Sequence, residues 1–211
     1  MTRSANRENR RRDIAEALLR VVGTRGLHAV TMRAVAAEAG VSLHLVQHYF
    51  ETKEQLMLFA LRQLAEQMAE RLQAKLAGTR RPREVLEAIL AEALPTDERS
   101  RIFHLAYTSY AVLAVTDKEL AAHSFLAAPD AMEAFVAGQL IQAQNDGDMA
   151  ADLDPRTEAI ALLAMSGGLG IAVLAGQRSV ESALAVLRTQ LARLVPAQTG
   201  QGIKSRRTPD M

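Results

Sequence analysis

The sequence contains no cysteine and no tryptophan, and aromatic residues make up only 4% of its 211 residues. The absence of cysteine excludes a disulfide scaffold, a thiolate metal site and a cysteine nucleophile, and it fits a reducing compartment. No stretch reaches the roughly 18 uninterrupted apolar residues of a membrane span, and the basic N-terminus precedes no apolar run of the secretory type. We therefore expect a cytoplasmic protein without a membrane partner.

Hydrophobic residues nevertheless make up 49% of the chain. A chain of this length buries roughly 70% of its unfolded surface, so a packed globular protein is expected. The most apolar stretch, residues 159–176, is rich in glycine and other small residues, and we interpret it as a buried helix.

The net charge of +1 conceals an uneven distribution along the chain. Residues 1–53 carry nine Lys and Arg against five Asp and Glu, residues 54–200 carry 13 against 18, and residues 201–211 carry three against one. A basic N-terminal segment on an acidic body indicates an anionic partner, for which nucleic acid is the leading candidate. A solvated basic surface without a partner is the alternative.

Helix-forming residues dominate the sequence, and valine and threonine never alternate long enough to predict strands. We therefore predict an all-α protein of about nine helices. Caps such as Thr31, Ser42 and Asp154 mark helix starts, and Thr52 with Gln55 forms a capping-box pattern. The predicted helices cover approximately residues 7–24, 32–40, 43–50, 53–77, 82–94, 98–115, 117–145, 155–176 and 180–194.

Two short predicted helices meet at "AGVS", residues 39–42, where Ser42 caps the second helix. This is the layout of a helix-turn-helix that reads DNA. His44, Gln47 and His48 lie on the face of the second helix opposite its apolar side. A solvated surface helix more often carries Lys and Glu, so these hydrogen-bonding groups indicate a face that meets DNA. Ordinary packing of two helices around the same turn is the alternative.

The stretch "RRDIAEALLRVVGTRGLHAVTMRAVAAEAGVSLHLVQHYFETKEQLMLFAL" resembles the N-terminal domain of the TetR family of transcriptional repressors across about fifty residues. The matching features are "RG" after the first helix, Thr31 opening the second, "AGVS" at the turn, and "HYF" followed by "TKEQL". Beyond residue 60 the resemblance extends only to the family's helical architecture. It implies a ligand-responsive repressor that binds a palindromic operator in double-stranded DNA as a homodimer and is released by a small-molecule effector.

The resemblance also implies which residues contact DNA, some through phosphate and others through base edges. Hydroxyl caps and helix amino ends suit phosphate on chemical grounds as well, and Gln47 is able to read adenine. The predicted DNA-binding residues are Thr31, Arg33, Ser42, Leu43, His44, Leu45, Gln47, His48, Tyr49 and Lys53.

The recognition helix departs from the commoner family pattern, which has a small residue at 44, a hydroxyl at 45 and an aromatic at 47. Leu43 and Leu45 can touch thymine methyl groups, but no operator sequence follows from them. The departures keep open a small-molecule binding protein that has lost DNA recognition. The basic arm "RSANRENRRR" has two interpretations, a minor-groove contact and a disordered tail.

We predict three parts: a DNA-binding domain with its basic arm at residues 1–53, a ligand-binding and dimerisation domain at residues 54–196, and a disordered tail at residues 197–211. Small residues near 164–172 allow close helix approach, and a leucine stripe follows on the last helix. The alternative to a dimer is that the small residues and the leucine stripe pack against other helices of the same protomer. The predicted interface residues are Ala164, Gly167, Gly168, Gly170, Leu184, Leu187 and Leu191.

Most aromatic residues of the second domain, with several methionines, fall on three of its predicted helices. Such residues suit a cavity for a small apolar or aromatic effector, although an ordinary core is the alternative for each of them. The predicted ligand-binding residues are Met68, Phe103, His104, Tyr107, Tyr110, Phe125, Met132 and Phe135.

No catalytic or cofactor motif is present: the sequence has no HExxH, no GxSxG and no phosphate-binding loop. Among five histidines, only His44 and His48 have metal-ligand spacing, and we expect these two to face DNA. We therefore predict no enzyme, no cofactor and no metal. A dimer that coats DNA without sequence preference remains an alternative, because it would share the basic arm and the helix-turn-helix but bind all sequences with similar, salt-dependent affinity.

Overall fold

The computed structural model describes residues 3–115 and 128–196. Within these ranges the chain forms nine α-helices, one short 3-10 helix and no strand, which confirms the all-α prediction. The α-helices are α1 (Arg3–Arg25), α2 (Met32–Glu38), α3 (Leu43–Tyr49), α4 (Lys53–Leu76), α5 (Pro82–Glu92), α6 (Glu98–Ala114), α8 (Ala128–Asn145), α9 (Pro155–Leu174) and α10 (Val180–Leu194).

The predicted start signals of the first helices are present in the structure. Thr31, Ser42 and Thr52 each accept a hydrogen bond from the backbone N–H three residues on, at 3.0, 3.1 and 3.1 Å. The side-chain oxygen of Gln55 accepts from the backbone N–H of Glu51 at 3.1 Å, so the return bond of the predicted capping box reaches the residue before the cap instead of Thr52 itself. These local bonds fix where α2, α3 and α4 begin.

The basic arm is helical, because α1 begins at Arg3 and includes it. The Arg11 guanidinium carbon lies 4.4 Å from the ring centroid of Phe59 and 5.1 Å from that of Phe50, so cation–π contacts join α1 to α4 and to the end of α3. The prediction of a helix from 117 onward lies partly outside the described residues. Its described part, α8, begins at Ala128 with Pro129 in the first turn.

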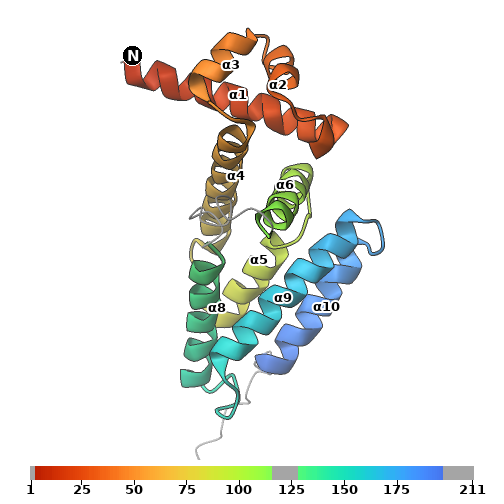
Figure 1. Ribbon diagram of the computed structural model, residues 1–211. Helices are drawn as coiled ribbons and strands as arrows, with labels where there is room; N and C mark the ends of the chain where they lie inside the picture. Colours follow the sequence, from red (N-terminus) through yellow and green to blue (C-terminus); the bar gives the residue numbers. More distant parts are fainter. Residues whose placement is uncertain (1–2, 116–127, 197–211) are drawn as a thin grey trace, which may run out of the picture.

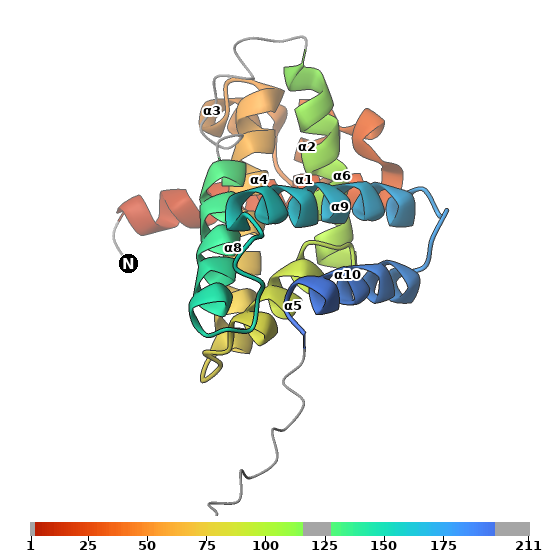
Figure 2. The ribbon, with the colours of Figure 1, turned by 90° about the horizontal axis from the view of Figure 1, so that it is seen from below.

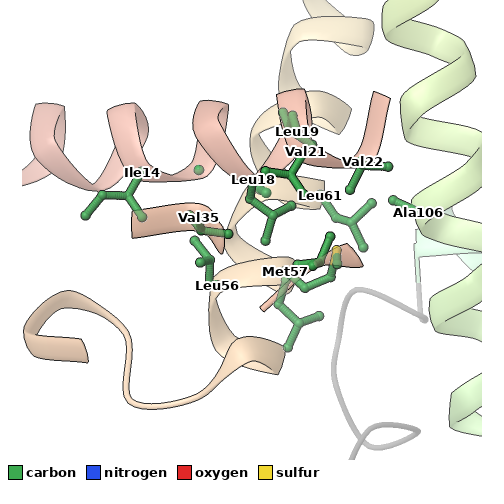
Figure 3. Packing of buried hydrophobic residues seen from close by; sticks show 14 of the residues in the cluster. Ile14, Leu18, Leu19, Val21, Val22, Val35, Leu56, Met57, Leu61 and Ala106 are labelled. Atoms are coloured by element: carbon green, nitrogen blue, oxygen red, sulfur yellow. The ribbon is translucent and has the colours of Figure 1, made fainter. Parts of the chain in front are cut away.

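The N-terminal helices share a first hydrophobic core with α6 and with the N-terminal part of α4, from Leu56 to Leu64. Figure 3 shows Leu18 of α1, Val35 of α2 and Leu61 of α4 directed into this core, and all three are fully buried. At Gly23 a Cβ atom would lie 3.0 Å from the Cδ1 atom of Ile102, so the glycine allows α6 to approach α1 closely. α1, the first helix of the N-terminal domain, therefore packs on α6 as well as on α4.

A second hydrophobic core joins α5, α8, α9 and α10, with Leu86, Leu140 and Leu162 among its fully buried members. Leu72 and Leu76, near the end of α4, pack against this core as well. α4 is consequently the one described helix with side chains in both cores, and Figure 1 shows it leading from the helix-turn-helix toward α5 and α8. The domain boundary predicted at 53/54 remains a prediction, because the first core continues past it.

α9 is more exposed than we expected. It is long and apolar enough to cross a membrane, with a mean hydropathy of 1.7, yet only 22% of its apolar window is buried. Ile160 and Ile171 are 48% and 54% exposed, which corrects the prediction of a buried helix. The physical reason is that α9 and α10 run side by side along one flank of the molecule (Figures 1 and 2), so only one side of α9 meets the core.

Replacing Leu61 with alanine is expected to lower the free energy of unfolding by about 2–5 kcal/mol, because the residue is fully buried in the first core. Urea unfolding at one fixed protein concentration measures the change. Ile141→Ala, at a site 49% exposed on α8, is the matched control and should stay within about 0.5 kcal/mol of the parent. Similar losses for both variants would contradict the assignment of Leu61 to the core.

Candidate DNA interface and ligand cleft

The second helix of the helix-turn-helix, α3, presents three polar side chains to solvent. His44, Gln47 and His48 are all exposed, whereas Val46 between them is fully buried. The His48 ring also makes an edge contact with Tyr49, with the ring centroids 5.4 Å apart. The structure therefore brings the three predicted polar groups together on one accessible face.

The amino ends of α2, α3 and α4 are capped by the side-chain oxygens of Thr31, Ser42 and Thr52. Because each capping oxygen only accepts a bond from its own helix, the hydroxyl groups of Thr31 and Ser42 retain a hydrogen to donate to phosphate. Arg33 on α2 and Lys53 at the start of α4 are exposed cations. This combination of hydroxyl donors, cations and helix amino ends suits a phosphate backbone.

The remaining predicted DNA contacts are less accessible. Leu43 and Tyr49 are half-buried and pack against the first hydrophobic core, and Leu45 is half-buried as well. Part of the surface of each of these side chains is therefore covered within the protein and is not available to DNA. Their roles toward DNA remain predictions.

A largely apolar cleft of about 480 Å³ lies between α6 and α9, next to the end of α5. The predicted ligand-binding residues Phe103, His104 and Tyr107 line it from α6. The rings of Phe103 and Tyr107 stack, with centroids 5.8 Å apart and planes 16° apart. The other described lining residues are Ala93, Thr108, Ala111, Val112, Val115, Leu163, Ser166, Gly167, Gly170, Ile171 and Leu174.

Several predicted ligand-binding residues do not line the cleft. Tyr110 is buried in the first core, and Met68 borders a separate depression beside Gln67 and Arg71. Met132 and Phe135, 38% and 46% exposed, lie on the outer surface of α8, which corrects their placement in a cavity. Phe125 lies outside the described residues.

The α9 side of the cleft was missed by the sequence analysis. The α6 side carries a signal, since Phe103, Tyr107 and Ala111 recur at a spacing of four residues and so share a helix face. No comparable signal pairs α6 with α9, because Ser166 and Gly170 are ordinary small residues of an apolar helix. Their place in the cleft follows only from the tertiary packing.

His104 is the polar group of the cleft with the most unusual surroundings. Burial lowers the pKa of His104, and a hydrogen bond with the Glu92 backbone and the Glu92 charge oppose the shift without cancelling it. Its Nε2 atom is buried and has no hydrogen-bond partner within the described part of the chain. Burial likewise raises the pKa of the neighbouring Tyr107 phenol. The imidazole is therefore held neutral near pH 7.

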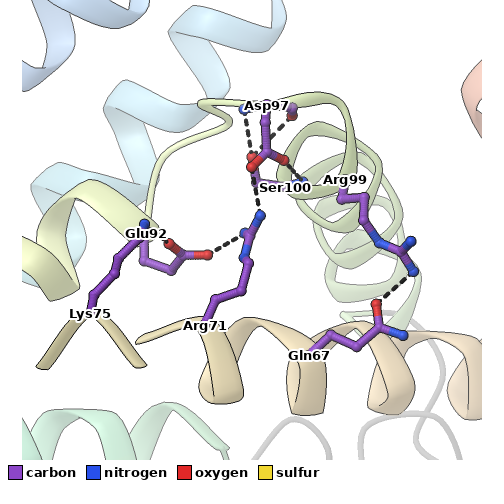
Figure 4. Close-up of polar contacts among 7 residues, drawn as sticks. All are labelled: Gln67, Arg71, Lys75, Glu92, Asp97, Arg99 and Ser100. Atoms are coloured by element: carbon purple, nitrogen blue, oxygen red, sulfur yellow. Dashed lines mark hydrogen bonds and ion pairs between the residues drawn. The ribbon is translucent and has the colours of Figure 1, made fainter. Parts of the chain in front are cut away.

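Glu92 connects the cleft to α4. Its side chain is only 8% exposed and accepts bonds from two cations of α4, Arg71 and, at 2.8 Å, Lys75. Arg71 also pairs with Asp97 at 2.6 Å, ahead of α6, and Figure 4 shows Arg71 between the two carboxylates. Although burial pushes the pKa of Asp97 up, hydrogen bonds from the Ser100 backbone and from Arg71 hold it below its ordinary value.

Arg99 on α6 makes a second connection. Its guanidinium donates to Gln67 of α4 at 2.6 Å and to Glu16 of α1 at 2.9 Å. Arg99, on the helix that lines the cleft, thus bonds both α4 and α1, the first helix of the N-terminal domain. These polar bonds were not predicted, because the partners are between 17 and 83 residues apart in sequence.

The predicted dimer residues divide into two groups. Ala164, Gly167 and Gly168 are exposed on α9. Leu187 and Leu191 are 1% and 0% exposed within the protomer's second core, Leu184 packs against that core, and Gly170 is buried facing Ala93 and Pro95. Packing within the protomer thus accounts for Leu187, Leu191 and Gly170 and for part of Leu184, and the role of these four residues in a dimer remains a prediction.

Two family profiles match the chain, one near its N-terminus and one over its C-terminal half. Residues 14–59 match "Bacterial regulatory proteins, tetR family", and residues 82–196 match "BetI-type transcriptional repressor, C-terminal". The chain belongs to the TetR family. The members of this family are transcriptional regulators, which confirms the predicted resemblance and the prediction that the protein is not an enzyme.

Curated relatives of this TetR-family regulator match over part of their length. PksA, an HTH-type transcriptional regulator of Bacillus subtilis, is 36% identical over 114 residues, which are 53% of this chain and 56% of PksA. BetI of Brucella anthropi, also an HTH-type regulator, is 42% identical over 82 residues, 39% of this chain and 42% of BetI. The matches thus span about half the length of these relatives.

Solved structures match the TetR-family regulator over most of its length. A transcriptional regulator from Saccharomonospora viridis in complex with choline has a TM-score of 0.82 and 26% identity, with 89% of this chain and 98% of that chain covered. A transcriptional regulator from Rhodococcus sp. Rha1 has a TM-score of 0.75 and 27% identity, with 89% and 98% covered. Both likenesses support the helical architecture described above.

Stability is expected to fall as the pH drops below 6.5, because unfolded His104 binds a proton at that ordinary pKa while the folded residue, with its lowered pKa, does not. The slope from this one proton is at most about 1.4 kcal/mol per pH unit. Urea unfolding of the parent and of His104→Gln between pH 5 and 8 measures how the free energy of unfolding depends on pH. The variant should lose the part of this dependence that comes from His104. His28→Gln, at an exposed histidine, is the control and should retain it; equal slopes in all three proteins would contradict the assignment.

Proposed function

We propose that this TetR-family regulator is a ligand-responsive repressor that binds a palindromic operator as a homodimer and is released by a small effector in the α6–α9 cleft. The main support is the exposed polar face of α3, formed by His44, Gln47 and His48 beside capped helix amino ends. A structural helix would more often carry Lys and Glu there. Operator binding is the function that uses these groups.

The exposed face of α9 supports the homodimer. From Ile160 to Ala175 it consists only of small or apolar residues, and a soluble monomer rarely leaves such a face in water. Beside Met165 of α9, α10 contributes Ala185 and Val186 in a row that also includes the polar residues Ser182, Thr189, Gln190 and Arg193. A second copy related by two-fold symmetry would cover both rows and set the spacing of the two recognition helices. The exposed residues of the α9 face are Ile160, Ala161, Ala164, Gly167, Gly168, Ile171 and Ala175.

Release by an effector requires that the effector favour a conformation with poorly spaced recognition helices. The cleft is well positioned for this, because His104 contacts the Glu92 backbone and the Glu92 carboxylate is held by Arg71 and Lys75 of α4. A ligand that shifts α6 would also act on the Arg99 bonds to α1 and α4. Because α4 enters both cores, a small rotation of this helix would move the helix-turn-helix.

Two effector classes are candidates. Choline is bound by the Saccharomonospora viridis regulator, and the matching C-terminal profile is of the BetI type. The apolar lining of the cleft instead favours a small apolar or aromatic molecule. We adopt the second class, since none of the described lining residues is acidic.

Selection from a random DNA pool is expected to enrich one palindrome that outcompetes a scrambled duplex. Gln47→Ala should reduce the preference for the selected sequence by about 1–3 kcal/mol per lost base contact. Arg33→Ala should weaken binding to both duplexes alike and reduce the slope of log affinity against log salt by about one. Fluorescence anisotropy at several salt concentrations separates the two effects.

Two outcomes would contradict operator recognition. Equal, strongly salt-dependent affinity for the palindrome and the scrambled duplex would identify a protein that coats DNA. No binding at low salt would leave a ligand-binding protein without DNA recognition. Arg62→Ala on the exposed surface of α4, away from the helix amino ends, is the control for loss of any one positive charge.

Gly168→Gln is expected to abolish dimerisation while the protomer remains folded. An added Cβ meets nothing within 4 Å in the protomer, and replacing a helical glycine stabilises a helix by about 0.5–1 kcal/mol. Analytical ultracentrifugation gives the dissociation constant. Gly138→Gln on α8, where a Cβ atom also meets nothing within 4 Å, is the matched control and should remain dimeric. A dimer of unchanged affinity in Gly168→Gln would exclude this face of α9.

A further inference from the structure

The hydrogen-bonding groups of the cleft have a defined polarity. Since Nε2 of His104 has no partner in the described chain, the bond to the Glu92 backbone uses Nδ1, which must carry the proton to donate to a carbonyl. Nε2 therefore keeps its lone pair, and because this atom is buried, a ligand reaches it by displacing the side chains that cover it. The Ser166 hydroxyl donates to the Leu162 carbonyl at 2.9 Å, so its oxygen is also left as an acceptor toward the cleft. Both groups call for a donor on the ligand.

The cleft offers no compensation for a ligand charge. Apart from His104, which is held neutral, none of the described lining residues is acidic or basic. The carboxylate of Glu92, whose backbone contacts His104, is already bound by Arg71 and Lys75. A cation transferred from water into this apolar surface would remain unpaired, which is costly.

The aromatic groups favour a flat ligand over a compact cation. Phe103 and Tyr107 lie one helical turn apart on α6, and their rings are nearly parallel. Rings that enclose a quaternary ammonium approach it from several sides, whereas these two come from one helix. A planar ring can extend their stack while the aliphatic side chains of α9, such as Leu163 and Ile171, cover its other side.

We propose that the effector is an uncharged aromatic molecule with one O–H or N–H group, which donates a hydrogen bond to Nε2 of His104. This inference rests on the proposed function in taking the cleft as the effector site. It assigns His104 as the residue that determines effector specificity. It also separates this regulator's ligand from the choline held by its structural relative.

The test uses two probes of nearly equal shape, 2-naphthol and 2-methoxynaphthalene, because only the first carries a donor. Isothermal titration of the full-length protein at pH 7.5 is expected to give tighter binding of 2-naphthol by about tenfold, the contribution of one buried hydrogen bond. Choline is expected to bind more weakly than either. Equal affinity for both naphthalenes, tighter binding of choline, or no binding of 2-naphthol would overturn the proposal.

His104→Phe removes the acceptor while keeping an aromatic ring, and it is expected to abolish the preference for 2-naphthol. His28→Phe, at an exposed histidine of the 3-10 helix, is the matched control and should preserve it. A second measurement does not depend on a variant that folds: the ¹⁵N resonance of His104 Nε2 in the parent protein should move upfield with 2-naphthol and not with its methyl ether. An unchanged resonance during saturating binding would place the ligand elsewhere.

Failure of this inference and failure of the proposed function give different results. The selected palindrome is titrated with protein in the presence of each probe. If 2-naphthol binds through His104 without weakening operator binding, the ligand assignment stands and release by an effector in this cleft is excluded. If choline weakens operator binding and 2-naphthol does not bind, the regulator function stands and the ligand assignment is wrong.

Discussion

The position of α4 in two hydrophobic cores is the constraint on which the rest of the structure depends. Residues from Leu56 to Leu64 are packed with α1, α2 and α6, while Leu72 and Leu76 are packed against the bundle of α5, α8, α9 and α10. Both cores thus include side chains from this helix. A rigid helix anchored at both ends transmits rotation, since packed interfaces shift between discrete arrangements more readily than they deform.

Polar bonds also hold α4 to α5 and to α6, the helix that lines the cleft. Glu92 would be costly to bury alone, and two cations from successive turns of α4 compensate its charge. The backbone of the same residue contacts His104, so Glu92 links this cleft residue to the C-terminal turns of α4. Arg99 adds a direct bond to α1. A change at the cleft therefore has two short routes to the helix-turn-helix.

The two exposed faces of the protein differ in chemistry, as two partners of different kinds would require under the proposed function. α3 exposes imidazole and amide groups that exchange water for base edges or phosphate at small cost. α9 exposes isoleucine, alanine and glycine, whose hydration is unfavourable and is relieved by another apolar surface. The cleft lies against the same helix, with Gly167 and Ile171 belonging to both its lining and the exposed face. Under the proposed function, the effector site and the dimer face are thus adjacent on α9.

The sequence by itself determined the helices and the polar face of α3, because caps at Thr31, Ser42 and Thr52 and helical periodicity act within a few residues. It also carried the family's N-terminal motif. Only the tertiary structure decided that Leu187 and Leu191 pack inward, that Ile160 and Ile171 remain exposed, and that α6 meets α9 to form a cleft. An apolar stripe on a helix indicates that the stripe is buried, but it does not specify which other helix covers it, because the hydrophobic effect has no direction. That choice depends on how all the helices fill space together.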